Sequence, residues 1–334
     1  MNKNLILLTN NYWIKEYYLE SIIPIKIDNV YLISDKKNLF IIDNLKKSKL
    51  NHKFLYTKNL SLNWLKKKID IKNSVVISAG SPWVINESII KEFKNNIYNI
   101  HQSALPLMRG AVNSYVRLYN IKSIQTTIHV VNKKIDQGEI VFKRDVYINR
   151  SLNLPIQINN YLQKHNRLML KDFLKDHIKG NKKIRIYKQD NFFSTYNPRL
   201  KSEINGWINW NMNVYELDRF INAFEDPYPG ARTMIHGKTV ILKEVDYSCS
   251  DASKHQFENG MILRRFMGKL VVSVNGGSLY IGKILSNKKN IFNKLKPGEL
   301  FYTPESKLNL IKRKNLFIKN KKIFTNKKKL KNIK

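Results

Sequence analysis

Three short apolar runs near the start of the chain constrain its fold more than any other feature of the sequence. They cover residues 4–8, 30–34 and 74–78, and polar segments with helical character lie between them. Short buried strands that alternate with helical connections are typical of a parallel β-sheet with helices packed on it. The sequence therefore predicts an α/β fold with a Rossmann-like, mostly parallel sheet.

The turn after the first of these runs lacks the glycine pattern of a dinucleotide-binding fold. A G-x-G-x-x-G turn lets the backbone approach a pyrophosphate group closely. Here the turn reads Thr9-Asn10-Asn11. We therefore expect a Rossmann-like strand order without a dinucleotide site.

The pattern changes in the second half of the chain. A polar stretch at residues 189–202 predicts a linker, and a helix is expected over residues 214–224. Short apolar segments follow at residues 238–245, 260–265, 269–274 and 278–284. Several short strands within about 100 residues are typical of a small β-barrel.

Length and composition agree with two domains. A chain of 334 residues has room for two units of about 100 to 200 residues each, and 43% hydrophobic residues supports buried cores. We expect a first domain over residues 1–188 and a β-rich second domain over residues 203–305. The linker at 189–202 joins them, and a Lys-rich tail follows at 306–334.

One polar cluster is predicted at the end of a strand. The segment Y-N-I-H, residues 98–101, reads as a strand that enters a loop containing proline and glycine. Side chains alternate along a strand, so Asn99 and His101 point to the same face. Asp136 lies in the turn of a β-hairpin expected over residues 126–148. An amide, an imidazole and a carboxylate without a Ser or Cys suit a reaction in which the substrate supplies the nucleophile.

Five motifs give the chain a resemblance to a known family. N-x-H at 99–101 is followed by S-x-L-P-x-x-R-G at 103–110 and D-x-G-x-I at 136–140. The segments E-I-N-G-W-I-N-W (203–210) and A-F-E-D-P-Y-P-G-A-R-T (223–233) come later. Together they resemble the folate-dependent formyltransferases, which include methionyl-tRNA formyltransferases and amino-sugar N-formyltransferases. N-x-H alone occurs by chance, but the ordered set is specific.

The resemblance implies an activity and roles for the cluster. These enzymes move a formyl group from N10-formyltetrahydrofolate to a primary amine, and their C-terminal domain is an open barrel similar to an OB-fold. The amide of Asn99 and a protonated His101 would stabilise the oxyanion, and Asp136 would pair with His101 and assist proton removal. One well-placed donor to a developing oxyanion contributes about 2.7–4 kcal/mol.

The resemblance also implies a folate pocket. Its lining is expected from residues in the loop after the strand at 74–78, in the loop after His101 and beside Asp136: Ser81, Pro82, Trp83, Val84, Leu105 and Ile135. No metal is expected, because the single cysteine, Cys249, excludes a Cys-based metal site and an internal disulfide. The loop residues Pro106, Arg109 and Gly110 are expected to be architectural, and His129 to be a packing or supporting residue.

The acceptor amine has two candidate classes. The basic segment from Asp35 to Leu50 lacks the Gly and Pro of the insertion that reaches into tRNA in the tRNA enzymes, and S-A-G-S-P-W (78–83) replaces their usual Tyr-Gly segment. Both departures favour a nucleotide-linked amino sugar. The net charge of +35 favours initiator methionyl-tRNA, although A+T-rich coding bias also accounts for abundant lysine. A formyltetrahydrofolate hydrolase and a non-catalytic RNA-binding relative are further alternatives.

The sequence also bears on the compartment. No run approaches the ~18 consecutive apolar residues of a membrane span, and the apolar core at residues 5–8 is too short for a signal peptide. We therefore expect no membrane span and a cytoplasmic location.

Overall fold

The computed structural model describes residues 4–47, 50–71, 73–94, 96–149, 151–180, 182–250, 255–310, 316–319 and 322–325. Contacts divide the chain into two compact units. The first unit contains Met1–Val112, Ser123–Tyr147 and Asn160–Asn197. The second unit contains Asn113–Lys122, Ile148–Asn159 and Pro198–Lys334. The division is therefore not a single cut in the sequence, because two segments of the N-terminal half belong to the second unit.

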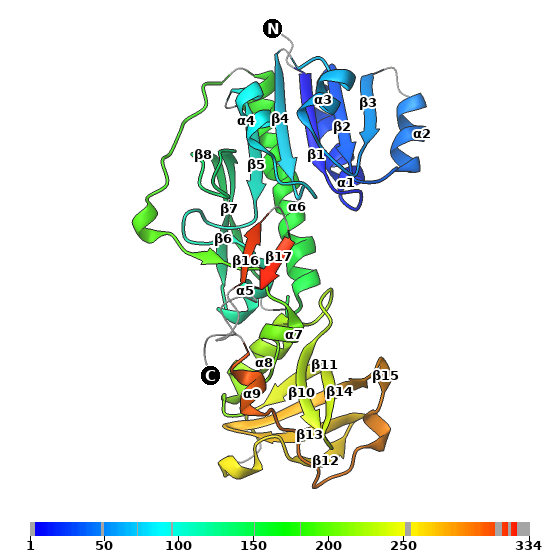
Figure 1. The fold of residues 1–334 in the computed structure, drawn as a ribbon, viewed down its shortest axis with the longest axis vertical. Helices are drawn as coiled ribbons and strands as arrows, with labels where there is room; N and C mark the ends of the chain where they lie inside the picture. Colours follow the sequence, from blue (N-terminus) through cyan, green and yellow to red (C-terminus); the bar gives the residue numbers. More distant parts are fainter. Residues whose placement is uncertain are drawn as a thin grey trace. The chain divides into compact units, whose positions relative to one another are not determined.

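The first unit is built on a seven-stranded sheet of order β3-β2-β1-β4-β5-β7-β8 (Figure 1). The five strands from β3 to β5 are parallel, and β7 and β8 continue the sheet in antiparallel orientation. The strands are β1 (Asn4–Thr9), β2 (Asn29–Ser34), β3 (Asn51–Tyr56), β4 (Ser74–Ala79), β5 (Ile97–His101), β7 (Ser123–Val130) and β8 (Ile140–Tyr147). The prediction of a mostly parallel α/β sheet is confirmed.

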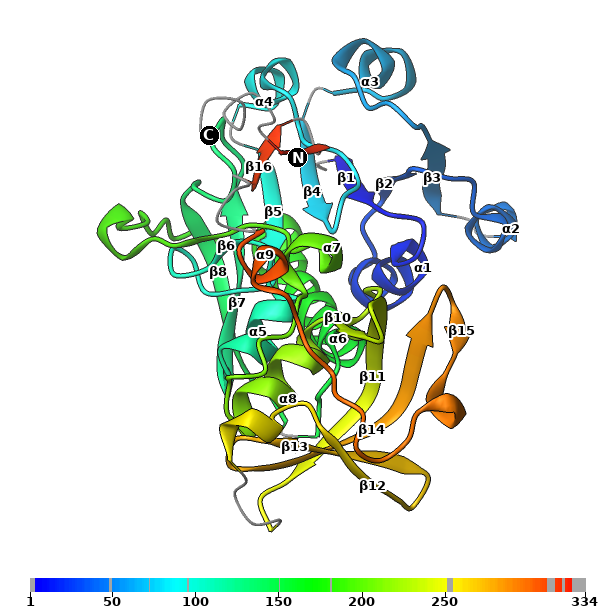
Figure 2. The same ribbon diagram turned by 60° about the horizontal axis from the view of Figure 1, so that its bottom comes forward.

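Helices cover both faces of this sheet (Figure 2). Leu5 and Leu7 of β1 belong to a core that includes residues of α1 and α6, whereas Ile6 and Leu8 belong to a core that includes residues of α3 and α4. A strand that is buried on both faces reads as a continuous apolar run, which explains the run at residues 4–8. The helices of this unit are α1 (Ile14–Tyr17), α2 (Leu39–Lys47), α3 (Leu62–Lys68), α4 (Glu87–Phe93) and α6 (Pro155–Phe173), whose first turn belongs to the second unit.

Local sequence explains how the chain reaches β5. The side chain of Asn86 accepts a hydrogen bond from the Ile89 N–H (3.1 Å) and caps α4. Helix α4 returns the chain to the start of β5, which pairs in parallel with β4. The carboxyl ends of both strands therefore lie at the same edge of the sheet, with Ala79 opposite Ile100.

The second unit contains an antiparallel sheet of order β10-β11-β14-β13-β12, with β15 paired to β14. Its strands are β10 (Ala231–Ile235), β11 (Lys238–Ser248), β12 (Ile262–Phe266), β13 (Lys269–Val274), β14 (Gly277–Ser286) and β15 (Lys289–Asn290). One segment bridges the two edges of the sheet: Leu300 pairs with Met261 and Tyr302 pairs with Met234. The sheet therefore curls toward a barrel, and its interior holds one apolar core with helix α8 (Val214–Ala223).

Among the described residues, three further α-helices and a two-stranded hairpin belong to the second unit. The second unit also contains α5 (Asn113–Leu118), α7 (Ser202–Asn205) and α9 (Glu305–Leu308), and β16 (Leu316–Lys319) pairs with β17 (Lys322–Thr325). No described helix combines the length and apolar character needed to cross a membrane.

Most of the segment predicted as a linker, residues 189–202, is part of the first unit. Residues 189–197 belong to the first unit. Strand β9 (Tyr196–Asn197) pairs in parallel with β6 (Arg109–Gly110), and the Ala111 N–H donates to the Asn197 carbonyl (2.8 Å). The polar side chains that made this stretch resemble a linker are used in hydrogen bonds to the loop after β5.

Candidate active site

The structure brings Asn99, His101 and Asp136 together at the end of β5. Nδ1 of His101 lies 3.7 Å from Oδ2 of Asp136. Nδ2 of Asn99 lies 3.2 Å from Nε2 of His129, which in turn lies 3.6 Å from Oδ1 of Asp136. Asn99 and His129 are opposite each other in the β5–β7 register. The predicted three-residue cluster therefore has four members, with His129 between Asn99 and Asp136.

Asp136 is a buried carboxylate, with a side chain only 12% exposed. Burial favours its neutral form, but the positive charge of His101, the contacts with His129 and the Gly110 N–H favour the carboxylate more strongly. The pKa of Asp136 is therefore well below its ordinary value. The site holds a fixed negative charge beside two imidazole rings.

The loop after β5 orients His101. Nε2 of His101 donates to the carbonyl oxygen of Met108 (2.8 Å), and the Ser103 hydroxyl donates to the same oxygen. Thr127 on β7 in turn donates to the Ser103 carbonyl (3.2 Å). The S-x-L-P-x-x-R-G segment therefore folds back on the strand that precedes it, and it includes a cis peptide bond between Leu105 and Pro106.

A glycine allows the close contact between this loop and Asp136. The Gly110 N–H donates to Oδ2 of Asp136 (3.0 Å). Gly110 has φ +86°, and a Cβ at this position would lie 2.4 Å from the carbonyl oxygen of Asn197. A larger residue would thus strain the backbone and collide with β9. This explains the glycine of the R-G pair.

The turn that carries Asp136 also depends on a close approach. Asp136 itself has φ 55°, in the left-handed region that aspartate tolerates better than most residues. A Cβ on Gly138 would lie 1.6 Å from the carbonyl oxygen of Val130, so only glycine fits. The D-x-G spacing is therefore a requirement of the turn.

Gln189 joins this turn to Arg109. Its amide nitrogen donates to the carbonyl oxygens of Asp136 (3.0 Å) and Gly138 (2.6 Å). Its amide oxygen accepts from Nε (3.1 Å) and Nη2 (2.8 Å) of Arg109, and Nη2 also donates to Asn191 (2.8 Å). Gln189 thus links the buried Arg109 to the turn that carries Asp136 and holds that turn in place. These contacts are consistent with the architectural role expected for Arg109.

The residues expected to line a folate pocket lie around the same sheet edge. The loop that begins at Gly80 leaves β4 next to the end of β5. In it, the Trp83 N–H donates to the Ser81 hydroxyl (3.2 Å), and the Trp83 indole N–H donates to the Lys58 carbonyl (3.1 Å). Pro82 is partly buried between them.

The other expected lining residues differ in exposure. Val84 and Ile135 are 45% and 43% exposed, so their apolar side chains are accessible to a ligand. Leu105 is buried and packs within the loop after β5.

Two residues of the site lie outside the predicted three-residue cluster. His129 was expected to be a packing or supporting residue, and only the β5–β7 register places it beside Asn99. Gln189 was assigned to a linker, and no local signal distinguishes it from neighbouring polar residues. Among the described residues, no group of three or more His, Cys, Asp or Glu side chains has the arrangement of a metal site.

Comparison with known families assigns the chain. The family model described as formyl transferase matches residues 22–171, and the model described as formyl transferase, C-terminal domain, matches residues 201–296. The chain belongs to the formyltransferase family. Asn99, His101 and Asp136 all lie within the first of these two matches.

Curated formyltransferase-family relatives resemble the chain over part of their length. The bifunctional polymyxin resistance protein ArnA of Wigglesworthia glossinidia brevipalpis is 29% identical over 295 residues, which cover 86% of this chain and 42% of ArnA. A methionyl-tRNA formyltransferase of Thermotoga neapolitana is 29% identical over 175 residues, or 52% of this chain and 54% of the relative. The matches thus span about half the length of these two relatives or less.

Solved structures share the fold. An N-formyltransferase from Helicobacter canadensis, in complex with folinic acid and dTDP-3-aminofucose, superposes with a TM-score of 0.61 at 19% identity, covering 84% of this chain and 99% of that one. WlaRD, a sugar 3N-formyl transferase, gives a TM-score of 0.60 at 20% identity, with 86% and 99% covered. These likenesses confirm a formyltransferase fold with a parallel-rich sheet and a separate antiparallel sheet.

Proposed function

We propose that the protein transfers a formyl group from N10-formyltetrahydrofolate to a primary amine. The observation that carries this proposal is the convergence of Asn99, His101 and Asp136 at one end of β5, with His101 3.7 Å from a buried carboxylate. Family membership supports the reaction class. The site needs no protein nucleophile, because the amine itself attacks the formyl carbon.

Asn99 and His101 are proposed to stabilise the oxyanion. When an amine adds to a formamide carbon, negative charge develops on the oxygen, and donors aimed at that position lower the barrier. The amide nitrogen of Asn99 carries two N–H groups, and its contact with His129 uses one of them.

The hydrogen bonds of His101 suggest which of its nitrogens would take part. Nε2 is engaged by the Met108 carbonyl, so the N–H directed at the substrate is on Nδ1. The 3.7 Å separation between Nδ1 and Asp136 exceeds hydrogen-bond length. Nδ1–H is therefore free to donate to the substrate oxygen while Asp136 supplies charge to the ring.

Asp136 is proposed to pair with His101 and to assist removal of the amine proton. Its low pKa keeps it ionised at neutral pH, so it attracts the charged imidazole. Its place beside His101, and not its pKa, is the reason to propose that it receives the amine proton, directly or through water. The new C–N bond forms as the bond between the formyl carbon and the folate nitrogen breaks. The proton lost by the amine is then available to the departing folate nitrogen.

The folate is proposed to supply the formyl group. Its ring would lie against the loop after β4 and the exposed apolar residues near Asp136. The residues proposed to hold it are Ser81, Pro82, Trp83, Val84, Leu105 and Ile135.

We favour a nucleotide-linked amino sugar as acceptor. The segment after β2, where the tRNA enzymes carry a Gly- and Pro-bearing insertion, forms the plain helix α2. The H. canadensis structure contains dTDP-3-aminofucose, and WlaRD is described as a sugar 3N-formyl transferase. Both superpose over more than four-fifths of this chain.

Initiator methionyl-tRNA is the second candidate. Several relatives are named methionyl-tRNA formyltransferase, including those of Thermotoga neapolitana and Ureaplasma parvum. The net charge of +35 also suits a polyanionic substrate. Both candidates use the same donor and the same cluster.

The test is transfer of labelled formyl from N10-formyltetrahydrofolate to two sets of acceptors in parallel: a panel of nucleotide amino sugars and charged initiator methionyl-tRNA. We expect label on an amino sugar and loss of transfer in His101→Ala. His255→Ala, which alters an exposed histidine of the second unit, serves as the matched control. Label only on tRNA would select the second candidate. Free formate without any acceptor would indicate a hydrolase, and salt-sensitive RNA binding without transfer would indicate a non-catalytic relative.

A further inference from the structure

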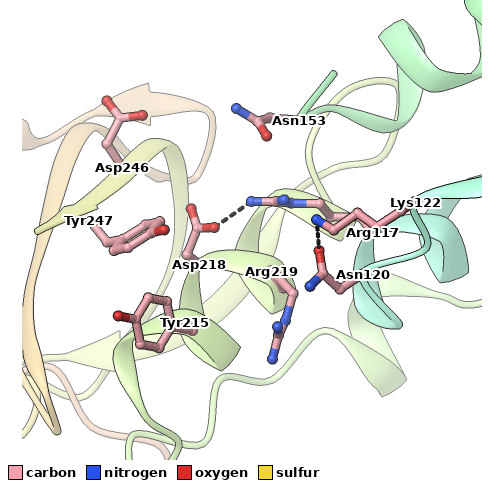
Figure 3. A pocket seen from close by; sticks show the side chains of 9 residues that line it. All are labelled: Arg117, Asn120, Lys122, Asn153, Tyr215, Asp218, Arg219, Asp246 and Tyr247. Atoms are coloured by element: carbon pink, nitrogen blue, oxygen red, sulfur yellow. Dashed lines mark hydrogen bonds and ion pairs between the residues drawn. The ribbon is translucent and has the colours of Figure 1, made fainter. Parts of the chain in front are cut away.

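A pocket in the second unit shares no residue with the cluster around Asp136 (Figure 3). Its volume is about 400 Å³, within the range of about 300–1,000 Å³ typical of small-molecule sites. The turn after α5, the segment before α6, helix α8 and strand β11 line it. The lining residues are Arg117, Asn120, Lys122, Asn153, Tyr215, Asp218, Arg219, Asp246 and Tyr247.

A buried ion pair lies on one side of this pocket. Oδ2 of Asp218 pairs with Nη2 of Arg117, and Oδ1 of Asp218 accepts from the Asn222 amide (2.7 Å). Nε of Arg117 is buried, and none of the described residues accepts a hydrogen bond from it. Because Nε is shielded from solvent, it lies beneath the pocket surface, and Asp218 pairs with the charge of this guanidinium.

The charges that remain around the pocket are positive. The two acids of the lining are already paired, Asp218 with Arg117 and Asp246 with Lys269. Lys122 donates only to the neutral side chain of Asn120, and within the described part of the chain Arg219 forms no ion pair. Lys122 and Arg219 therefore keep their charge for an anionic ligand such as a phosphate.

Two tyrosines form an aromatic wall. The rings of Tyr215 and Tyr247 meet edge to face, with centroids 5.3 Å apart and an interplanar angle of 71°. They are 51% and 42% exposed, so ring surface is accessible from the pocket side. Exposed aromatic rings of this kind provide stacking surfaces for planar bases.

We propose that this pocket binds a small nucleotide. Its phosphates would contact Lys122 and Arg219, and its base would pack on the rings of Tyr215 and Tyr247. A volume of about 400 Å³ suits a mononucleotide and not a polynucleotide chain. This inference does not rest on formyl transfer, because no lining residue belongs to the proposed catalytic cluster.

The probe is uridine 5′-diphosphate, titrated calorimetrically into the full chain. Arg219→Ala and Tyr247→Ala remove one charge and one ring, and we expect each to weaken binding about tenfold or more. Lys238→Ala, which removes an exposed lysine of β11 outside the lining, should bind like the wild type. Circular dichroism checks that each variant folds. If Arg219→Ala does not fold, the affinity of Tyr247→Ala is the test of the proposal.

A nucleotide site in the first unit would be recognised separately. Two binding events would then appear in the wild type. We expect Arg219→Ala to lose the event that belongs to the pocket of the second unit, and His101→Ala to retain it. Wild-type protein that shows no binding of uridine 5′-diphosphate would overturn the proposal. So would wild-type affinity in both pocket variants, or an Arg219-dependent site that binds a short oligoribonucleotide but not the diphosphate.

Discussion

Two buried aspartates, one in each unit, have pKa values shifted in opposite directions. Asp136 and Asp218 have similarly buried side chains, 12% and 7% exposed. Burial raises the pKa of both, but for Asp136 two imidazoles and a backbone N–H outweigh it, and the pKa falls. For Asp218, Arg117 and Asn222 do not compensate for burial and for the nearby charge of Asp246, and the pKa rises. The number and placement of donors and charges, not burial, therefore decide whether the pKa of a buried carboxyl falls or rises.

The largest expected effect is a difference in formyl transfer between variants of the two aspartates. Asp136→Asn removes the charge beside His101 and the proposed proton acceptor, so formyl transfer should fall about 10²–10⁴-fold. Asp218→Asn changes an equally buried aspartate of the second unit, and transfer should be unchanged. The measurement is kcat/KM for both variants with the same acceptor. Equal losses would show that burial of a carboxylate, and not its position beside His101, matters.

The second prediction concerns the hydrogen bonds that hold the Asp136 turn. Gln189→Leu keeps the bulk of the side chain but removes four hydrogen bonds to Arg109, Asp136 and Gly138. A shift of the carboxylate of about 1 Å costs about 10²-fold in rate, so kcat should fall by that order with KM nearly unchanged. Gln125→Leu, which removes a hydrogen bond to Asp145 at the surface, is the control. A rise in KM at constant kcat would instead assign Gln189 to substrate binding.

The third prediction compares two glycines with left-handed φ, one in each unit. Gly237 has φ +70° and nothing within 4 Å of an added Cβ, so Gly237→Ala should cost only the backbone strain, about 1–2 kcal/mol. Gly110→Ala adds a collision with Asn197 and should cost about 1–3 kcal/mol more. Amide hydrogen exchange at Ala111, whose N–H bonds to Asn197, reports the local opening. Equal protection in both variants would mean that β6 and β9 separate without cost.

The smallest effect is a difference in pH dependence. Because the pKa of Asp136 is lowered, its contribution to stability is present above the ordinary carboxyl pKa of 3.8 and is lost as the pH falls through the lower folded-state value. Because the pKa of Asp218 is raised, its contribution is present below 3.8 and is lost as the pH rises through the higher folded-state value. A ¹³C carboxyl titration should therefore show Asp136 still ionised at a pH where Asp218 is already protonated. The reverse order would contradict the comparison.

Several elements were predictable because their signal is local. Strands β1, β2 and β4 were expected from apolar runs, since strands buried on both faces need apolar residues at every position. Helix α8 carries its own capping box at Asn213 and Glu216. Strand β3 was not predicted, because its sequence N-H-K-F-L-Y has apolar residues only at its last three positions, and only His52 of its six residues is buried.

The sequence by itself indicated the fold class and the barrel-like second unit through its apolar patterns. Its resemblance to the formyltransferases, carried by motifs whose turns require glycine, indicated the side chains Asn99, His101 and Asp136. The tertiary structure alone decided the surroundings of that cluster. His129 reaches Asn99 through the pairing of β5 with β7, and Gln189 reaches Asp136 because residues 189–197 fold back on the loop after β5. Contacts between residues distant in sequence depend on register and chain path, which no local pattern encodes.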